Sequence, residues 1–200
     1  MATEVAIIDS GGANITSLRF ALERLGATSI VSSDPEVIAS ASHVILPGVG
    51  AAEDAMARLR ATELDQLIPT LEQPVLGICL GMQLLADASE EDQATCLGVV
   101  AGTSRLLNAS PQAPVPNMGW CELEHVESHP LLAGIGTGAW FYFVHSYALA
   151  PAEYTVAQAS HTRSFTAVLA RDNFMATQFH PERSAKSGAR VLGNFLDMAV

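Results

Sequence analysis

The stretch Pro74-Val75-Leu76-Gly77-Ile78-Cys79-Leu80-Gly81 is an apolar run that ends in a cysteine between two glycines. A short, unbroken apolar run predicts a strand that is buried on both faces. Glycines two positions before and after a central residue relieve crowding at a tight strand-to-helix turn, where the central residue adopts strained dihedrals. We therefore expect a strand over residues 74–78 and a helix that begins near Met82.

Similar apolar runs alternate with helical patterns on the N-terminal side of this stretch. The sequence predicts strands over residues 5–9, 29–32 and 44–46. It predicts helices over residues 15–25 and over most of 51–71, and a further helix that begins at Pro35 with Asp34 as its N-cap. Buried strands that are separated by helices indicate a parallel sheet with helices on both faces.

The second half of the chain has a different pattern. Shorter runs at 140–144, 155–157 and 165–169 predict partly antiparallel strands, and a helix over about 185–198 closes the chain. The sequence therefore predicts a single domain over residues 1–200, an α/β fold with an open, mainly parallel sheet, helices on both faces and an antiparallel extension.

Composition excludes several classes of function. The net charge of −11 argues against nucleic-acid binding, which needs clustered Lys and Arg. No apolar stretch approaches the roughly 20 residues that cross a bilayer, and the N-terminus lacks the pattern of a signal peptide, so we expect a cytoplasmic protein with no membrane contact. Three cysteines at irregular spacing predict neither a disulfide nor a metal site, and we expect no cofactor.

Cys79 stands where sheets of this kind form their active sites, at the carboxyl end of a strand. There its thiol would project from the sheet, the helix N-terminus would stabilise a thiolate, and the N–H of Leu80 would face a developing oxyanion. A buried core cysteine explains the same pattern equally well until a base is found.

The segment Gln178-Phe179-His180-Pro181-Glu182 offers that base. His180 would activate the thiol, and Pro181 would turn the chain so that the Glu182 carboxylate orients the imidazole. Other histidines, at 43, 125 and 129, are expected at the surface or in turns. The segment Pro47-Gly48-Val49-Gly50 could present backbone N–H groups to a ligand, although alone it is better explained as an ordinary turn between a strand and a helix.

Together, in this order and spacing, these three segments resemble the class I (triad-type) glutamine amidotransferases, a family with a flavodoxin-like fold, over nearly the whole chain. The resemblance implies that Cys79, His180 and Glu182 form a catalytic triad and that Cys79 forms a glutamyl thioester. It also implies that Val49 and Leu80 supply the N–H groups of an oxyanion hole.

Met82, the segment Asn117-Met118-Gly119-Trp120 and the run from Phe141 to Tyr147 are similar to one branch of that family, the glutaminase subunits of imidazole glycerol phosphate synthases. This finer resemblance implies a glutamine site formed by Gly48, Gly50, Gln83, Glu91, Ser146 and Tyr147. The chain departs from the family pattern at Ser10, where an aromatic residue is more usual, and at Ala13, Asn117, Cys121 and Ala176.

The same resemblance implies a heterodimer with a separate (β/α)₈ cyclase subunit that receives the ammonia through a tunnel. The chain itself has no Walker pattern or dinucleotide fingerprint, which favours an acceptor site on a second polypeptide. We expect the partner to contact Asn14, Asn117, Trp120 and Arg183. Two alternatives stay open: a glutaminase subunit of another synthase, for anthranilate or pyridoxal phosphate, and a catalytically inert docking module.

Overall fold

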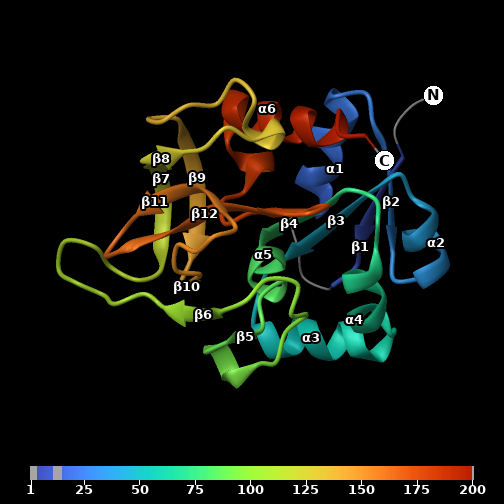
Figure 1. Cartoon of the computed structure of the whole chain (residues 1–200), viewed down its shortest axis with the longest axis horizontal. Helices are drawn as coiled ribbons and strands as arrows, with labels where there is room; N and C mark the ends of the chain where they lie inside the picture. Colours follow the sequence, from blue (N-terminus) through green and yellow to red (C-terminus); the bar gives the residue numbers. More distant parts are fainter. Residues whose placement is uncertain (1–3, 11–14, 200) are drawn as a thin grey trace.

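The computed structural model of the chain describes residues 4–10 and 15–199 (Figure 1). Its main strands are β1 (Glu4–Ile8), β2 (Thr28–Ser32), β3 (His43–Gly48), β4 (Val75–Cys79), β8 (His125–Val126), β11 (Thr155–Ser160), β12 (Ser164–Arg171) and β13 (Phe174–Thr177). The smaller strands are β5 (Ala88–Ser89), β6 (Thr103–Leu106), β7 (Asn117–Glu122), β9 (Trp140–His145) and β10 (Tyr147–Ala148). The helices are α1 (Ile15–Arg24), α2 (Pro35–Ser40), α3 (Ala52–Ala61), α4 (Leu64–Leu67), α5 (Leu80–Leu84) and α6 (Ala185–Leu196), with short 3₁₀ turns η1 (Ile68–Thr70), η2 (Glu91–Gln93), η3 (Pro130–Leu132) and η4 (Pro181–Arg183).

The main sheet has the strand order β2-β1-β3-β4-β13-β12-β11-β8. The strands from β2 to β13 pair in parallel, and β12, β11 and β8 continue the sheet by antiparallel pairing. The predicted fold class is therefore confirmed: an open, mainly parallel α/β sheet with an antiparallel extension.

Helices cover both faces of this sheet, because successive side chains of a buried strand point to opposite sides. Val5 and Ile7 of β1 pack in one core with α1 and α6, whereas Ala6 and Ile8 pack in a second core with α2, α3 and α4. Figure 1 shows α1 and α6 on one side of the sheet and α3 and α4 on the other. Both faces of a central strand are buried, which explains its unbroken apolar sequence.

Most predicted elements agree with the observed ones to within a few residues. Asp34 caps α2 as predicted, because its carboxylate accepts a hydrogen bond of 2.9 Å from the N–H of Glu36. The helical stretch over 51–71 is interrupted at Glu63, whose φ of 58° cannot continue a helix, so three short helical elements replace one.

Two smaller sheets pack beside the main one: β10-β6-β5 and β7-β9. The sequence did not predict β5, β6, β7, β8 or β10. Of these, β5, β8 and β10 have only two residues each, too few to show an alternating pattern. The sequence also did not predict that β13 lies next to β4.

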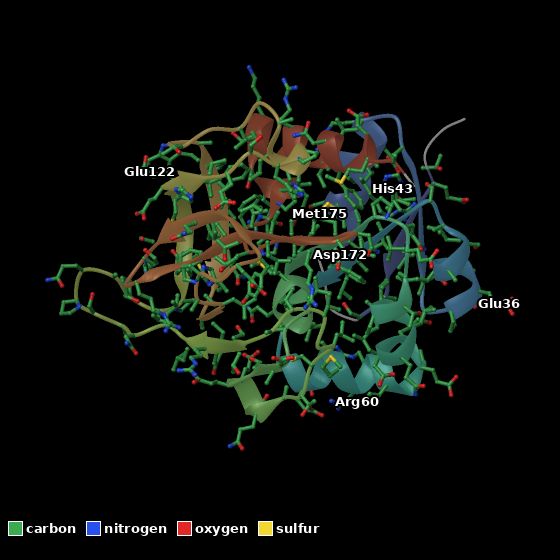
Figure 2. The ribbon with its side chains drawn as sticks, in the orientation of Figure 1. Glu36, His43, Arg60, Glu122, Asp172 and Met175 are labelled. Atoms are coloured by element: carbon green, nitrogen blue, oxygen red, sulfur yellow. The ribbon has the colours of Figure 1, made fainter. Side chains whose placement is uncertain are left out.

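His43 differs from its expected place at the surface. It is buried in β3, where Figure 2 labels it. Its ring packs edge-on against Phe195 of α6 with 5.1 Å between ring centroids. Burial lowers the pKa of His43, partly offset by hydrogen bonds with the backbone of Met198 and Phe195. Among the described residues, no helix is long and apolar enough to cross a membrane.

Candidate active site

Cys79 is the last residue of β4, and α5 begins at the next residue, two positions before the predicted start. Its backbone has φ 55° and ψ −108°, a combination that is strained for any residue with a side chain. A Cβ on Gly81 would overlap the Leu46 carbonyl oxygen, and a Cβ on Gly77 would stand 2.9 Å from the Gly81 carbonyl oxygen. The flanking glycines are therefore required because backbone segments approach each other closely around the turn.

His180 reaches Cys79 because β13 pairs with β4, with Thr177 beside Ile78. The chain leaves β13, passes through Gln178 and Phe179, and enters η4 at Pro181. His180 Nδ1 lies 2.9 Å from Glu182 Oε1, and only 10% and 5% of the two side chains are exposed. The carboxylate therefore holds the imidazole from its Nδ1 side, in a site from which water is largely excluded.

The charge of His180 follows from its neighbours. Burial lowers the pKa of His180, but hydrogen bonds with Cys79 and Glu182, together with the negative charges of these groups, raise the pKa to about 10. The raising effects are the larger ones, so the ring is an imidazolium at neutral pH when it faces a thiolate. A thiolate and an imidazolium in contact are the reactive form of a cysteine nucleophile.

A pocket of about 310 Å³ opens in front of this group. Predicted site residues that line it are Val49, Gly50, Cys79, Leu80, Gln83, Glu91, Ser146, Tyr147, His180, Glu182 and Arg183. A larger hollow of about 550 Å³ lies at the opposite end of the sheet, beside Asp172 and Met175 (Figure 2). It contains no predicted site residue, and neither does a hollow of about 730 Å³ along residues 126–137, so volume alone does not identify the site.

The segment that carries Val49 runs beside Cys79. Gly48 pairs in register with Cys79 across β3 and β4. A Cβ on Gly48 would stand 2.9 Å from the Gly81 nitrogen, so this glycine is required for close packing, and it does not line the pocket. Gly50 has φ 92°, which a residue with a side chain rarely adopts. Val49 and Leu80 both face the pocket.

Gln83 and Glu91 are polar residues of the pocket lining. Gln83 is buried, and its Nε2 donates to the Tyr147 carbonyl at 2.9 Å and to Gln178 Oε1 at 3.1 Å. Glu91 Oε2 accepts from the N–H of Ala52, the first residue of α3, at 2.9 Å. Burial raises the pKa of Glu91 and Asp92 raises it further, while the Ala52 hydrogen bond lowers it.

The residues predicted to contact a partner differ in how far their side chains are exposed. Trp120 is 48% exposed and packs edge-on against Tyr142, whose ring lies 4.6 Å below the Arg183 guanidinium. Asn117 is only 2% exposed, and its Nδ2 lies 3.0 Å from His145 Nε2, so its side chain has an internal partner and its contact with the partner subunit stays a prediction. Asn14 lies outside the described residues.

Two polar residues of the site were missed from the sequence. Gln178 is fully buried, and its Nε2 lies 3.8 Å from Cys79 Sγ. His145 lines the pocket; its Nδ1 donates to the Tyr147 carbonyl at 2.9 Å, so its Nε2 accepts from Asn117 at 3.0 Å. Burial lowers the pKa of His145 to about 4, and the ring is neutral. Gln178 and His145 belong to segments that the sequence singles out. Nothing local indicates that the Gln178 side chain turns toward the cysteine or that His145 lines the pocket.

Comparison with known proteins agrees with this geometry. The model of the family described as glutamine amidotransferase class-I matches residues 6–199. The HisH subunit of imidazole glycerol phosphate synthase from Vibrio cholerae is 47% identical, over 99% of this chain and 100% of its own length. The corresponding subunit from Xylella fastidiosa (strain Temecula1) is 48% identical over 98% of each chain.

Solved structures with the same fold are more distant in sequence. A structure titled glutamine amidotransferase superposes with a TM-score of 0.74 at 19% identity, over 96% of this chain and 97% of its own. A chain in the structure of PurLQS from Thermotoga maritima gives a TM-score of 0.71 at 18% identity, over 98% and 99%. These likenesses show the fold, while the family model and the nearer relatives show the family: the chain belongs to the class I glutamine amidotransferases, and within them to the HisH subunits of imidazole glycerol phosphate synthase.

Proposed function

We propose that this chain hydrolyses glutamine to glutamate and ammonia through a thioester on Cys79, and delivers the ammonia to a cyclase subunit. The observation that carries the proposal is the contact of Cys79, on its strained turn, with the buried His180–Glu182 pair. The cyclase would use the ammonia to form imidazole glycerol phosphate and an aminoimidazole carboxamide ribonucleotide, a step of histidine biosynthesis.

In the first half of the reaction, the Cys79 thiolate attacks the carboxamide carbon of glutamine. The negative charge moves to the carbonyl oxygen, where the N–H groups of Val49 and Leu80 would receive it. The His180 imidazolium gives its proton to the leaving nitrogen, so that the C–N bond breaks and neutral ammonia departs.

In the second half, His180 is neutral and accepts a proton from a water molecule. That water attacks the thioester carbon, and glutamate leaves as the Cys79 sulfur departs with the electrons of the C–S bond. Glu182 remains ionised throughout and stabilises the imidazolium. No cofactor is needed for these two reaction steps, because every proton and electron pair comes from the chain, glutamine or water.

The part of the pocket that Gln83 and Glu91 line suits the charged end of glutamine. The Glu91 carboxylate can accept hydrogen bonds from the α-ammonium group, and the raised pKa of Glu91 would fall when a cation binds beside it. We assign Gln83, Ser146 and Tyr147 to the rest of the amino-acid backbone, with Gly50 at the mouth of the oxyanion segment.

We infer that the cyclase docks on the outward face of β7 and β9. Three cross-strand pairs stand on that face: Met118 beside Val144, Trp120 beside Tyr142, and Glu122 beside Trp140. Met118, Trp120 and Trp140 are 64%, 48% and 53% exposed, an apolar stripe of the kind that marks an interaction surface. Val144 and Arg183 also line the pocket, so a partner on this face would cover the pocket and retain the ammonia.

The experiment that tests the assignment is labelling with a glutamine analogue that alkylates its thiol nucleophile. Labelling should occur on Cys79 and be lost in Cys79→Ser. Cys96 and Cys121 are internal controls, because burial raises their thiol pKa values, that of Cys96 to about 11. An inert docking module would leave all three cysteines unlabelled.

A glutaminase subunit of a different synthase is the second candidate. Capture of the cyclase subunit of imidazole glycerol phosphate synthase from purified components separates the two, since a subunit of anthranilate or pyridoxal phosphate synthase would not bind it. We also infer a cytoplasmic location, which the three free cysteines favour.

A further inference from the structure

Gln178 is a fully buried amide between the nucleophile and Gln83. Its Nε2 lies 3.8 Å from Cys79 Sγ, and its Oε1 accepts from Gln83 Nε2 at 3.1 Å. The peptide N–H of Gln178 donates to the Ala167 carbonyl at 2.9 Å, which fixes the backbone beside β12. The backbone of Gln178 is therefore fixed by the Ala167 carbonyl, and its side-chain amide by Gln83.

The orientation of the Gln178 amide follows from the Tyr147 carbonyl, to which it is linked through Gln83. The Tyr147 carbonyl can only accept, and Gln83 Nε2 donates to it at 2.9 Å. The same Gln83 nitrogen faces Gln178, so Gln178 must present its oxygen to Gln83. Its NH₂ group is left to face the sulfur of Cys79.

A donor at this position favours one form of the cysteine. A neutral thiol can donate to the Val144 carbonyl, which lies 3.5 Å from the sulfur. A thiolate can only accept, and it would be repelled by that carbonyl but stabilised by the N–H of Gln178 and by His180. Gln178, which follows β13 in the chain, would thus stabilise the thiolate from the interior of the protein.

We propose that Gln178 is a positioning residue for the reaction, whose N–H holds the Cys79 thiolate toward the pocket while Gln83 fixes the orientation of its amide. This inference rests on the proposed role of Cys79 as the nucleophile. The charged and titratable groups that line the pocket with Cys79 are Glu91, His145, Tyr147, His180, Glu182 and Arg183. Gln178 is neutral, so its replacement by an apolar residue leaves all these charges in place.

The test is Gln178→Met, which keeps the length of the side chain and removes the amide. The thiolate is measured in the full chain by its ultraviolet absorbance, with Cys79→Ala as the baseline. We expect the thiolate absorbance to fall, and kcat with the cyclase to fall by about tenfold or more, as for loss of a hydrogen bond to a charged group. KM for glutamine should change little, because Gln83 keeps its bond with the Tyr147 carbonyl.

Thr177→Val is the matched control, because Thr177 is buried next to Gln178 and its hydroxyl donates to the Phe179 carbonyl rather than to the site. It should lower thermal stability and leave the thiolate absorbance unchanged. Gln83→Met is the second variant: without Gln83 to hold it, the Gln178 amide can turn its oxygen to the sulfur, and the thiolate absorbance should fall here too. If Gln178→Met fails to fold, Gln83→Met decides the question.

Unchanged thiolate absorbance in folded Gln178→Met, or a raised KM with unchanged kcat, would overturn the inference. Failure of the proposed function is recognised separately, by glutaminase activity that survives Cys79→Ala. The thiolate measurement needs no glutamine, so each result can be obtained without the other.

Discussion

Gly81 lies directly against Leu46, so close that a methyl group on Gly81 would overlap the carbonyl oxygen of Leu46. This contact joins the start of α5 to β3, and it is the reason why β4 can turn so sharply at Cys79. The position of Cys79 thus depends on a neighbouring strand as well as on its own turn.

Gly81→Ala should therefore destabilise the protein by about 3 kcal/mol or more, because a backbone carbonyl cannot move aside as a flexible side chain can. Gly193→Ala in α6 is the control, since a Cβ there meets nothing within 4 Å and alanine favours a helix by about 1 kcal/mol. Urea unfolding of both variants measures the difference. Equal stability of the two variants would contradict the contact.

The protonation of His180 gives a pH-dependent stability with a defined sign. Burial lowers the pKa of His180, but Cys79 and Glu182 raise it to about 10, above the value of about 6.5 in an unfolded chain. This contribution to stability is fully present below about pH 6.5 and is lost as the pH rises through about 10.

Glu182→Gln should lower the pKa of His180, measured by NMR titration of the ring, and should reduce kcat by about 10²–10⁴-fold. An unchanged titration would show that the carboxylate does not act on the imidazole.

Ser10 restrains the strand that leads to the oxyanion segment. Its buried hydroxyl donates to the Pro47 carbonyl at 2.8 Å. Ser10→Ala leaves this carbonyl without that donor and should cost about 1–3 kcal/mol of unfolding free energy, measured in urea. Ser40→Ala removes an exposed hydroxyl bond to the Val37 carbonyl and should change stability by no more than about 0.5 kcal/mol.

Arg183 should contribute to the docking of the cyclase through its position over Tyr142. Arg183→Glu reverses the charge at the rim of the pocket and removes the stacking on Tyr142, so the Kd of the heterodimer should rise by about tenfold in a binding titration. Lys186→Glu changes the charge equally on nearby α6 and should have a much smaller effect. Unchanged affinity in Arg183→Glu would place the docking surface elsewhere.

The Val49 segment should limit glutaminase activity in the isolated chain. Gly50, at φ 92°, permits a turn of the Val49 peptide, and a partner that holds one orientation would complete the oxyanion hole. Steady-state assays with and without the cyclase and its ligand should show strong activation. Full activity of the isolated chain would exclude such control.

Several features were determined by the sequence itself, because their causes are local. The apolar runs define the central strands β1, β3 and β4, since a strand that is covered on both faces is mostly apolar. Asp34 and Pro35 define the start of α2. The glycines around Cys79 and the turn after His180 identify the reactive groups, because these residue types are required by the backbone at each position.

Only the tertiary structure decided how these groups meet. Strand pairing is set by packing between distant segments, so β13 beside β4 could not be read locally, although it brings His180 to Cys79. Burial likewise depends on what covers a residue: the fold placed His43 inside the protein, against expectation, and turned the Gln178 side chain toward the thiol. The sequence determined which residue is the proposed nucleophile, and the fold decided which side chains surround it.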